Sequence, residues 1–184
     1  MAYNKTEWIN NQEPAINAYN LNKMEQGIYD AVTGVDKKNN YIVAYKNNNQ
    51  TINVAGTSIR YYINAIMSQN GQGLIFHGAD GTSKANSIEI GSGIHHVEVN
   101  SQVYITAYGT ATTKSLYIYK NESQVTRAVS NISSNYETMA TSKIIIPVQE
   151  GDIITTRFRS NTGTNTVLGG STNGDNLLCI KVID

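Results

Sequence analysis

Residues 143–158, KIIIPVQEGDIITTRF, contain the clearest strand pattern in the chain. Ile144 and Ile146 fall on one face of a first strand, and Ile145 makes the opposite face apolar as well. A strand that is apolar on both faces is typical of a central strand, which is covered above and below. Proline is confined to the ends, edges or bulges of strands, so we expect Pro147 beside a bulge.

A second strand follows in the same stretch, where Ile154, Thr156 and Phe158 alternate along one face. Gly151 and Asp152 lie between the two strands. They supply the positive φ angle and the side-chain acceptor that a sharp reversal needs. The stretch therefore predicts a buried β-hairpin in an antiparallel all-β domain.

Short segments with alternating apolar residues recur along the chain, separated by runs rich in Gly, Asn, Ser and Thr. The further predicted strands are residues 74–77, 87–90, 95–100, 102–108, 115–120, 124–129 and 177–183. Many short strands with such turns are typical of a sandwich or barrel. We therefore predict a mainly β protein with an antiparallel head domain over residues 71–184.

The N-terminal block, residues 1–35, differs in character from the rest of the chain. Its apolar residues follow the three-four spacing of a helical seam, and they are Leu21, Met24, Ile28, Ala31 and Val35. Asn17 is the predicted N-cap, and Gly34 lies where the helix should end. So short a helix needs a packing partner. Either it docks on its own domain or it pairs with copies of itself, and the spacing does not decide between these alternatives.

Residues 36–70 are polar and rich in asparagine, and we expect a neck or linker with one or two short strands. Residues 41–46 have the pattern of one such strand. The pattern of residues 58–67 fits a strand or a helix, and its β-branched and aromatic content favours a strand.

The chain has 184 residues, in which 14 basic residues balance 14 acidic ones. Charged residues make up only 15% of the chain. This argues against a protein that binds nucleic acid and against one that binds membranes through a polybasic surface. No segment approaches the ~20 apolar residues that span a bilayer, and the N-terminus lacks a secretion-signal pattern. We expect synthesis in a cytoplasm. Cys179 is the one cysteine, which excludes an internal disulfide and predicts a buried structural thiol.

Tyrosine is unusually frequent, with 12 residues against 2 phenylalanines. Tyr104 and Tyr108 alternate with aliphatic residues in one predicted strand, as Tyr117 and Tyr119 do in the next. If these strands pair, aliphatic side chains line one face and tyrosines the other. A soluble monomer rarely exposes so much aromatic surface, so we expect the tyrosines to close an oligomer interface. Scattered surface tyrosines are the alternative.

No arrangement of reactive residues predicts an active site. His95 and His96 are neighbours on a predicted strand and point to opposite faces, so they do not share one metal ion. A ring of histidines from several subunits is the remaining metal arrangement. Asp152 and Asp175 adjoin glycines, where turn formation explains them better than calcium binding. No spaced carboxylate pair, nucleophile elbow or phosphate loop is present. We therefore expect no enzyme, no cofactor and no metal.

Four segments follow one another in the second half of the chain: GSGIHHVEVNSQVYITAY, LYIYKNESQV, SKIIIPVQEGDIITTRF and LLCIKVID. Their order resembles the jelly rolls of the tumour-necrosis-factor and complement superfamily over residues 87–184. In that superfamily a hairpin tip of the Lys-Asn-Gly type precedes the Gly-Asp turn. Here Glu122 stands in place of the usual glycine. The resemblance implies a jelly-roll head.

A second motif lies in the N-terminal block, and its residues are Trp8, Pro14, Ile16, Asn17, Ala18, Asn20, Leu21, Asn22, Lys23, Met24, Glu25, Gly27 and Ile28. It resembles the start of tail and baseplate proteins from phages and prophages of Gram-positive bacteria. The resemblance implies a homotrimeric virion protein of the tail tip, made in the host cytoplasm. Other tail or baseplate proteins are then its partners, and Trp8 serves virion attachment.

Together the two resemblances imply a non-enzymatic receptor-binding protein that recognises a bacterial surface glycan through the loops of a trimeric head. Saccharide sites combine aromatic platforms with amide and charged groups. The residues that offer these groups in predicted loops are Tyr136, Arg159, Asn161, Asn165 and Asp175. The expected oligomer interface combines the tyrosines with Leu21, Met24 and Ile28. The alternatives are a structural baseplate or fibre protein that mediates assembly only, and a cell-wall polysaccharide hydrolase.

Overall fold

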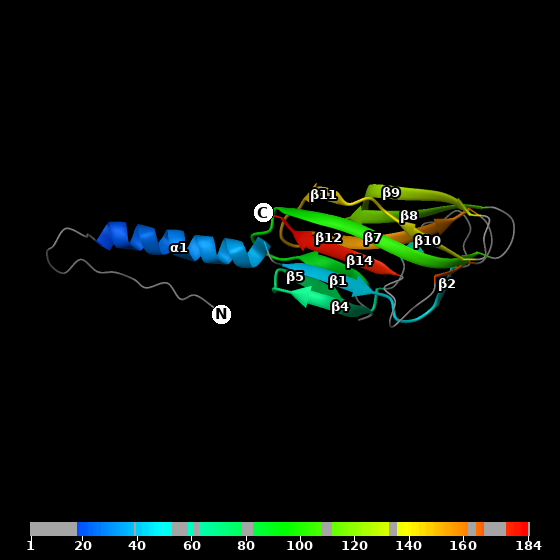
Figure 1. Ribbon diagram of the computed structural model, residues 1–184, viewed down its shortest axis with the longest axis horizontal. Helices are drawn as coiled ribbons and strands as arrows, with labels where there is room; N and C mark the ends of the chain where they lie inside the picture. The colour runs from blue at the N-terminus through cyan, green and yellow to red at the C-terminus, as the bar shows by residue number, and fades with distance from the viewer. Residues whose placement is uncertain are drawn as a thin grey trace.

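The computed structural model describes residues 18–38, 40–52, 59–60, 63–78, 83–107, 112–132, 136–161, 165–167 and 176–183. The helix α1 (Ala18–Lys38) projects from one end of a sandwich of two antiparallel sheets (Figure 1). The predicted N-cap, Asn17, lies outside the described residues. The predicted helix end at Gly34 is wrong, because the helix continues to Lys38. A glycine inside a helix costs about 1 kcal/mol relative to alanine, which a helix of 21 residues tolerates.

Sheet A has the strand order β2-β13-β7-β14-β1-β4, and β10 and β11 also pair with β7. Its strands are β1 (Tyr41–Tyr45), β2 (Gln50–Ile52), β4 (Ala65–Asn70), β7 (His96–Ala107), β10 (Tyr136–Ala140), β11 (Ile144–Pro147), β13 (Asn165–Val167) and β14 (Leu177–Val182). Sheet B has the order β5-β6-β12-β8-β9, and β3 also pairs with β12. Its strands are β3 (Ile59–Arg60), β5 (Leu74–His77), β6 (Ser87–Ile90), β8 (Thr112–Lys120), β9 (Ser123–Ile132) and β12 (Ile153–Ser160).

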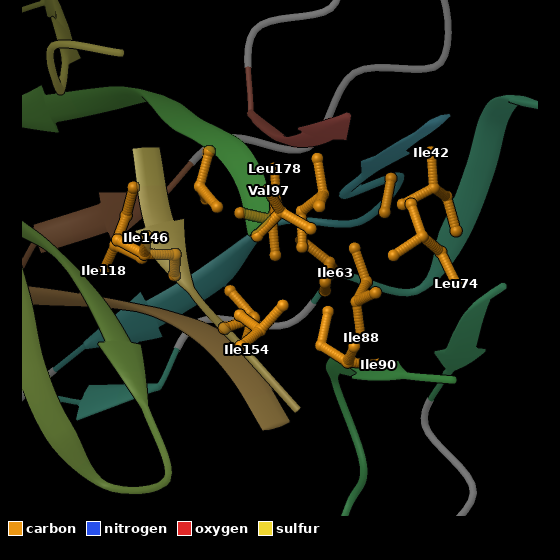
Figure 2. Close-up of a cluster of buried hydrophobic side chains, with 14 of the residues drawn as sticks. Ile42, Ile63, Leu74, Ile88, Ile90, Val97, Ile118, Ile146, Ile154 and Leu178 are labelled. Carbon is orange, nitrogen blue, oxygen red and sulfur yellow. The ribbon is translucent and has the colours of Figure 1, made fainter. Parts of the chain in front are cut away.

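The hydrophobic core fills the space between the two sheets (Figure 2). On β12 of sheet B, Ile154 and Phe158 are fully buried, because alternate residues of a strand point to the same face. Ile42 of β1 and Leu178 of β14 enter the same core from sheet A. Apolar burial of this kind stabilises the sandwich by about 25 cal/mol per Å² removed from water.

Residues 143–158 do not form the predicted β-hairpin. Their first strand, β11, pairs with β7 in sheet A, whereas their second strand, β12, pairs with β6 and β8 in sheet B. Ile146 points into the core, but Ile145 is 59% exposed on the outer face of sheet A, so the expected covering of both faces is also wrong. Alternation shows which side chains share a face, but it does not show which strand lies alongside. The chain therefore crosses between the sheets here.

Several strands of the sandwich fall within residues 36–70, where the sequence predicts a neck. β1 lies between β14 and β4 in sheet A, and its residues Ile42 and Ala44 are fully buried in the core. Part of residues 58–67 forms β3 and the start of β4, so the strand alternative is confirmed. The asparagine-rich flanks resemble linker sequence, but the short apolar runs between them belong to the head.

Asp152 anchors the crossing between the two sheets. Its carboxylate accepts hydrogen bonds from the Asn121 side chain at 2.5 Å and from the Gln149 backbone N–H at 3.0 Å. The Lys120 ammonium group lies 3.4 Å away. Burial alone would raise the pKa of Asp152, but these hydrogen bonds and the Lys120 charge outweigh it and lower the pKa. Gly151 has a φ angle of 84°, as the turn prediction requires.

Replacing Asp152 by asparagine should lower the free energy of unfolding by about 1–3 kcal/mol at neutral pH, because charge-assisted hydrogen bonds are lost. The folded-state pKa is lowered, so the carboxylate stabilises fully above its unfolded pKa of about 4 and loses this effect as the pH falls. The difference between the two proteins, measured by urea denaturation, should therefore shrink on acidification below about pH 4. A difference that stays constant would contradict this role.

Candidate functional site

Candidate binding residues gather at the end of the sandwich opposite α1, here called the far end (Figure 1). The strand ends that define it are Ala107, Thr112, Ile132, Tyr136 and Asn161. The antiparallel pairing places them together, because Thr112 pairs with Ile132 and Tyr136 pairs with Thr106 next to Ala107. β1, which leads from α1 into the sandwich, begins at the other end.

The structure brings four of the predicted ligand-binding residues to the far end. Asn161 follows β12 directly and is exposed, and its backbone N–H donates to the Thr113 carbonyl at 3.1 Å. Arg159 is half-buried on the outer face of sheet B. The sequence predicts Tyr136 and Asn165 in loops, but this prediction is wrong. Tyr136 begins β10 and Asn165 begins β13, and both strands pair with β7.

Three residues with predicted roles, Trp8, Tyr108 and Asp175, lie outside the described residues. Their roles in virion attachment, oligomer contact and ligand binding stay predictions.

The outer face of sheet A carries apolar side chains. One row across the sheet contains, in this order, Tyr41, Lys181, Glu98 and Ile145. The neighbouring rows add half-buried apolar residues, namely Val43, Tyr45, Tyr104, Leu177 and Cys179. Lys181 and Glu98 interrupt the apolar residues, but an outer sheet face that exposes several apolar side chains is typical of an interaction site.

Tyr104, Tyr117 and Tyr119 do not form the predicted common face. β7 belongs to sheet A and β8 to sheet B, so their tyrosines lie on opposite outer faces of the sandwich. The rings of Tyr117 and Tyr119 are close together, with centroids 6.0 Å apart. The prediction assumed that consecutive strands pair, but here the chain crosses from one sheet to the other between them.

The apolar seam of α1 is largely uncovered by the head. Met24 is 64% exposed and Ile28 is 47% exposed, while Leu21 is half-buried. The helix contacts the sandwich at β14. These exposures favour the alternative in which α1 pairs with copies of itself over the alternative in which it docks on its own domain.

All four arginines of the chain lie on the outer face of sheet B. One row across β3, β12, β8 and β9 contains, in this order, Arg60, Arg157, Tyr117 and Arg127. Arg159 lies two residues further along β12. We call the four arginines the arginine face. Sequence reasoning singled out Arg159 alone, because strand pairing brings residues from distant segments into the row.

Glu122 is a carboxylate that binds this face. It lies in the turn between β8 and β9 with a φ angle of 66°, a conformation that glycine adopts more readily. Its carboxylate forms ion pairs with Arg60, at 2.7 Å, and with Arg157. The hydrogen bond from Arg157 lowers the pKa of Glu122 against the opposing effect of desolvation. These contacts give a physical reason for glutamate at a turn position that favours glycine.

The next feature is the distribution of metal-ligating side chains among the described residues. No three histidine, cysteine, aspartate or glutamate side chains gather there as a metal ion would require. Cys179, predicted to be a buried thiol, is half-buried on the outer face of sheet A, and desolvation raises its pKa. In the described part of the chain, no helix is long and apolar enough to cross a membrane.

The sandwich is a tumour-necrosis-factor-like jelly roll, and the predicted fold is confirmed. The crystal structure of murine APRIL at pH 5.0 matches with a TM-score of 0.56 and 16% sequence identity, over 79% of this chain and 99% of its own. The structure of Eiger TNF from S. frugiperda matches with a TM-score of 0.56 and 8% identity, over 79% and 94%. At such identities the similarity concerns the fold alone. No protein-family model and no curated protein sequence matches this chain.

Proposed function

We propose that this chain is a non-enzymatic receptor-binding protein of a phage tail tip that attaches the particle to a bacterial surface glycan. The observation that supports the proposal is that the two ends of the molecule differ. α1 projects from one end of the jelly roll, and the candidate ligand-binding residues Arg159 and Asn161 lie towards the other (Figure 1). An N-terminal arm that contains Trp8 can then hold the virion while the far end faces the bacterium.

The proposed active form is a homotrimer. The outer face of sheet A and the seam of α1 both present apolar side chains, such as Ile145 and Met24, that a second copy would cover. Three far ends then point in one direction, and weak sites on one particle act together through multivalency. The other proposed partners are neighbouring tail or baseplate proteins and the bacterial saccharide.

The far end offers the chemistry that saccharides require. The exposed Asn161 amide supplies a donor and an acceptor for sugar hydroxyls, and the Arg159 guanidinium supplies charged donors. Tyr136 and Asn165 begin the two strands that flank β7 at the same end. Carbohydrate binding at the far end is thus the function that these residues support best.

Replacing Asn161 by alanine should weaken binding to purified cell-wall polysaccharide about tenfold, because one or two hydrogen bonds are lost. The measurement is interferometry of the intact protein on immobilised polysaccharide. Gln72→Ala is the matched control, because Gln72 is an exposed amide in the turn between β4 and β5, next to α1.

The control variant should bind like the unchanged protein. Binding that neither substitution alters would place the glycan site away from the far end. An intact trimer that binds no wall polysaccharide would instead favour the structural role in virion assembly.

A further inference from the structure

The arginine face breaks a rule of sheet stability. Arg60 and Arg157 are directly opposite on paired strands, and like charges in such positions are destabilising. Glu122 offsets these two arginines, whereas Arg127 and Arg159 form no ion pair within the described part of the chain. Sequences that break a local rule tend to do so at functional sites.

Two of the four guanidinium groups of this face are held on aromatic rings before any ligand arrives. Arg157 lies over the Tyr119 ring at 4.2 Å from its centroid, and Arg127 lies over the Tyr117 ring at 5.7 Å. Among the described residues, the Nε atom of Arg159 is shielded from solvent and has no hydrogen-bond partner. Guanidinium groups fixed on aromatic rings lose less entropy when they bind an anion.

The length of the arginine face favours a polymeric ligand over a single small anion. Arg60 and Arg127 stand at the two ends of a row across four strands, and neighbouring strands are about 4.8 Å apart. Their backbones are therefore separated by about 14 Å, which exceeds the size of one phosphate or carboxylate group. The Glu122 carboxylate, which bridges Arg60 and Arg157, shows the type of group that the face holds.

We propose that the arginine face binds an anionic polysaccharide through its phosphate or carboxylate groups. The guanidinium groups of Arg127 and Arg159, which Glu122 does not occupy, donate paired hydrogen bonds to two oxygens of an anionic group, a geometry that lysine does not reproduce. The choice of a polysaccharide rests on the proposed function. A nucleic acid fits less well, because the chain has a net charge of zero and lacks the broad basic surface that such binding needs.

The test measures, by calorimetry, the affinity of the intact protein for four polymers: a phosphomannan, polygalacturonate, neutral dextran and single-stranded DNA. The unchanged protein should bind at least one of the two anionic polysaccharides, and the stronger of these identifies phosphate or carboxylate. Arg127→Gln combined with Arg159→Gln should weaken this binding at least about tenfold. Lys23→Gln, which removes the charge of an exposed lysine on α1, should leave it unchanged.

A second variant tests whether binding depends on the positive charge alone or also on the planar shape of the guanidinium group. Arg127→Lys combined with Arg159→Lys keeps the charge and should still lose several-fold in affinity. Failure of both anionic polysaccharides to bind, equal binding of DNA, or full affinity in the glutamine variant would each overturn the inference.

The proposed function is tested separately by attachment of the same proteins to whole bacteria. Attachment without dependence on the arginines would overturn this inference alone. Binding to purified anionic polymer without attachment to bacteria would overturn the proposed function alone.

Discussion

Replacing Ile145 by aspartate should convert the protein from the proposed trimer of about 60 kDa, three times the chain mass of 20.1 kDa, into a monomer. Ile145 is 59% exposed on the outer face of sheet A, where it pairs with Glu98 of β7. Glu98 already pairs with Lys143 at 3.0 Å, so aspartate would place a second, unmatched negative charge beside Glu98 and inside the proposed interface. A buried charge without a partner costs several kcal/mol. Size-exclusion chromatography with light scattering measures the mass directly.

Ile75→Asp is the matched control for this prediction. Ile75 is 44% exposed on the outer face of sheet B and, like Ile145, belongs to a four-residue strand. The substitution makes the same chemical change on the face that the proposed trimer leaves open, so this variant should remain trimeric. A trimeric Ile145→Asp protein, or a monomeric unchanged protein at micromolar concentration, would contradict the proposed interface.

Replacing Phe158 by alanine should lower the free energy of unfolding by about 3–5 kcal/mol. Phe158 is fully buried between the sheets, and its neighbours on adjoining strands are Leu116 of β8 and Ile59 of β3. Alanine removes the ring and leaves a cavity that the rigid sandwich fills only in part. Urea denaturation of both proteins at the same concentration measures the change, because the contribution of trimer assembly is then the same for each.

The control for this prediction is Val129→Ala. Val129 is 52% exposed on β9, so its truncation should change the free energy of unfolding by less than about 0.5 kcal/mol. If both substitutions had equal effects, the proposed core between the sheets would be wrong.

Some elements of the fold were predictable from local pattern. β5 and β6 have the bounds that the sequence predicts, because each is a short apolar segment between clear turn residues. The partners of β11 and β12 were not predictable, since alternation is local and the choice of sheet depends on the whole topology. The sequence does not predict β10 and β13, because both are short and lack clear apolar alternation, and pairing with β7 determines their conformation.

The candidate site was predictable only where residues are close in the sequence. Arg159 and Asn161 adjoin a predicted strand end, and the structure places them near the far end. The row from Arg60 through Arg157 to Arg127 depends on three separate strand pairings. One local signal was available: Glu122 stands where the jelly-roll resemblance implies glycine, and it reaches two of these arginines.

The two outer faces and the far end thus have separate proposed roles. Apolar residues of sheet A hold the copies together, the arginine face of sheet B binds anionic groups, and the far end meets the receptor. Gly151 and Asp152 connect β11 of sheet A to β12 of sheet B, and their backbones hydrogen-bond with Ile90 of β6.

Calorimetric titration of the unchanged protein with purified host cell-wall polysaccharide is the most direct test of the proposed function. We predict saturable binding and no increase in reducing ends during the titration. An intact trimer that gives no binding, or a polysaccharide that is cleaved, would contradict a non-enzymatic receptor-binding role.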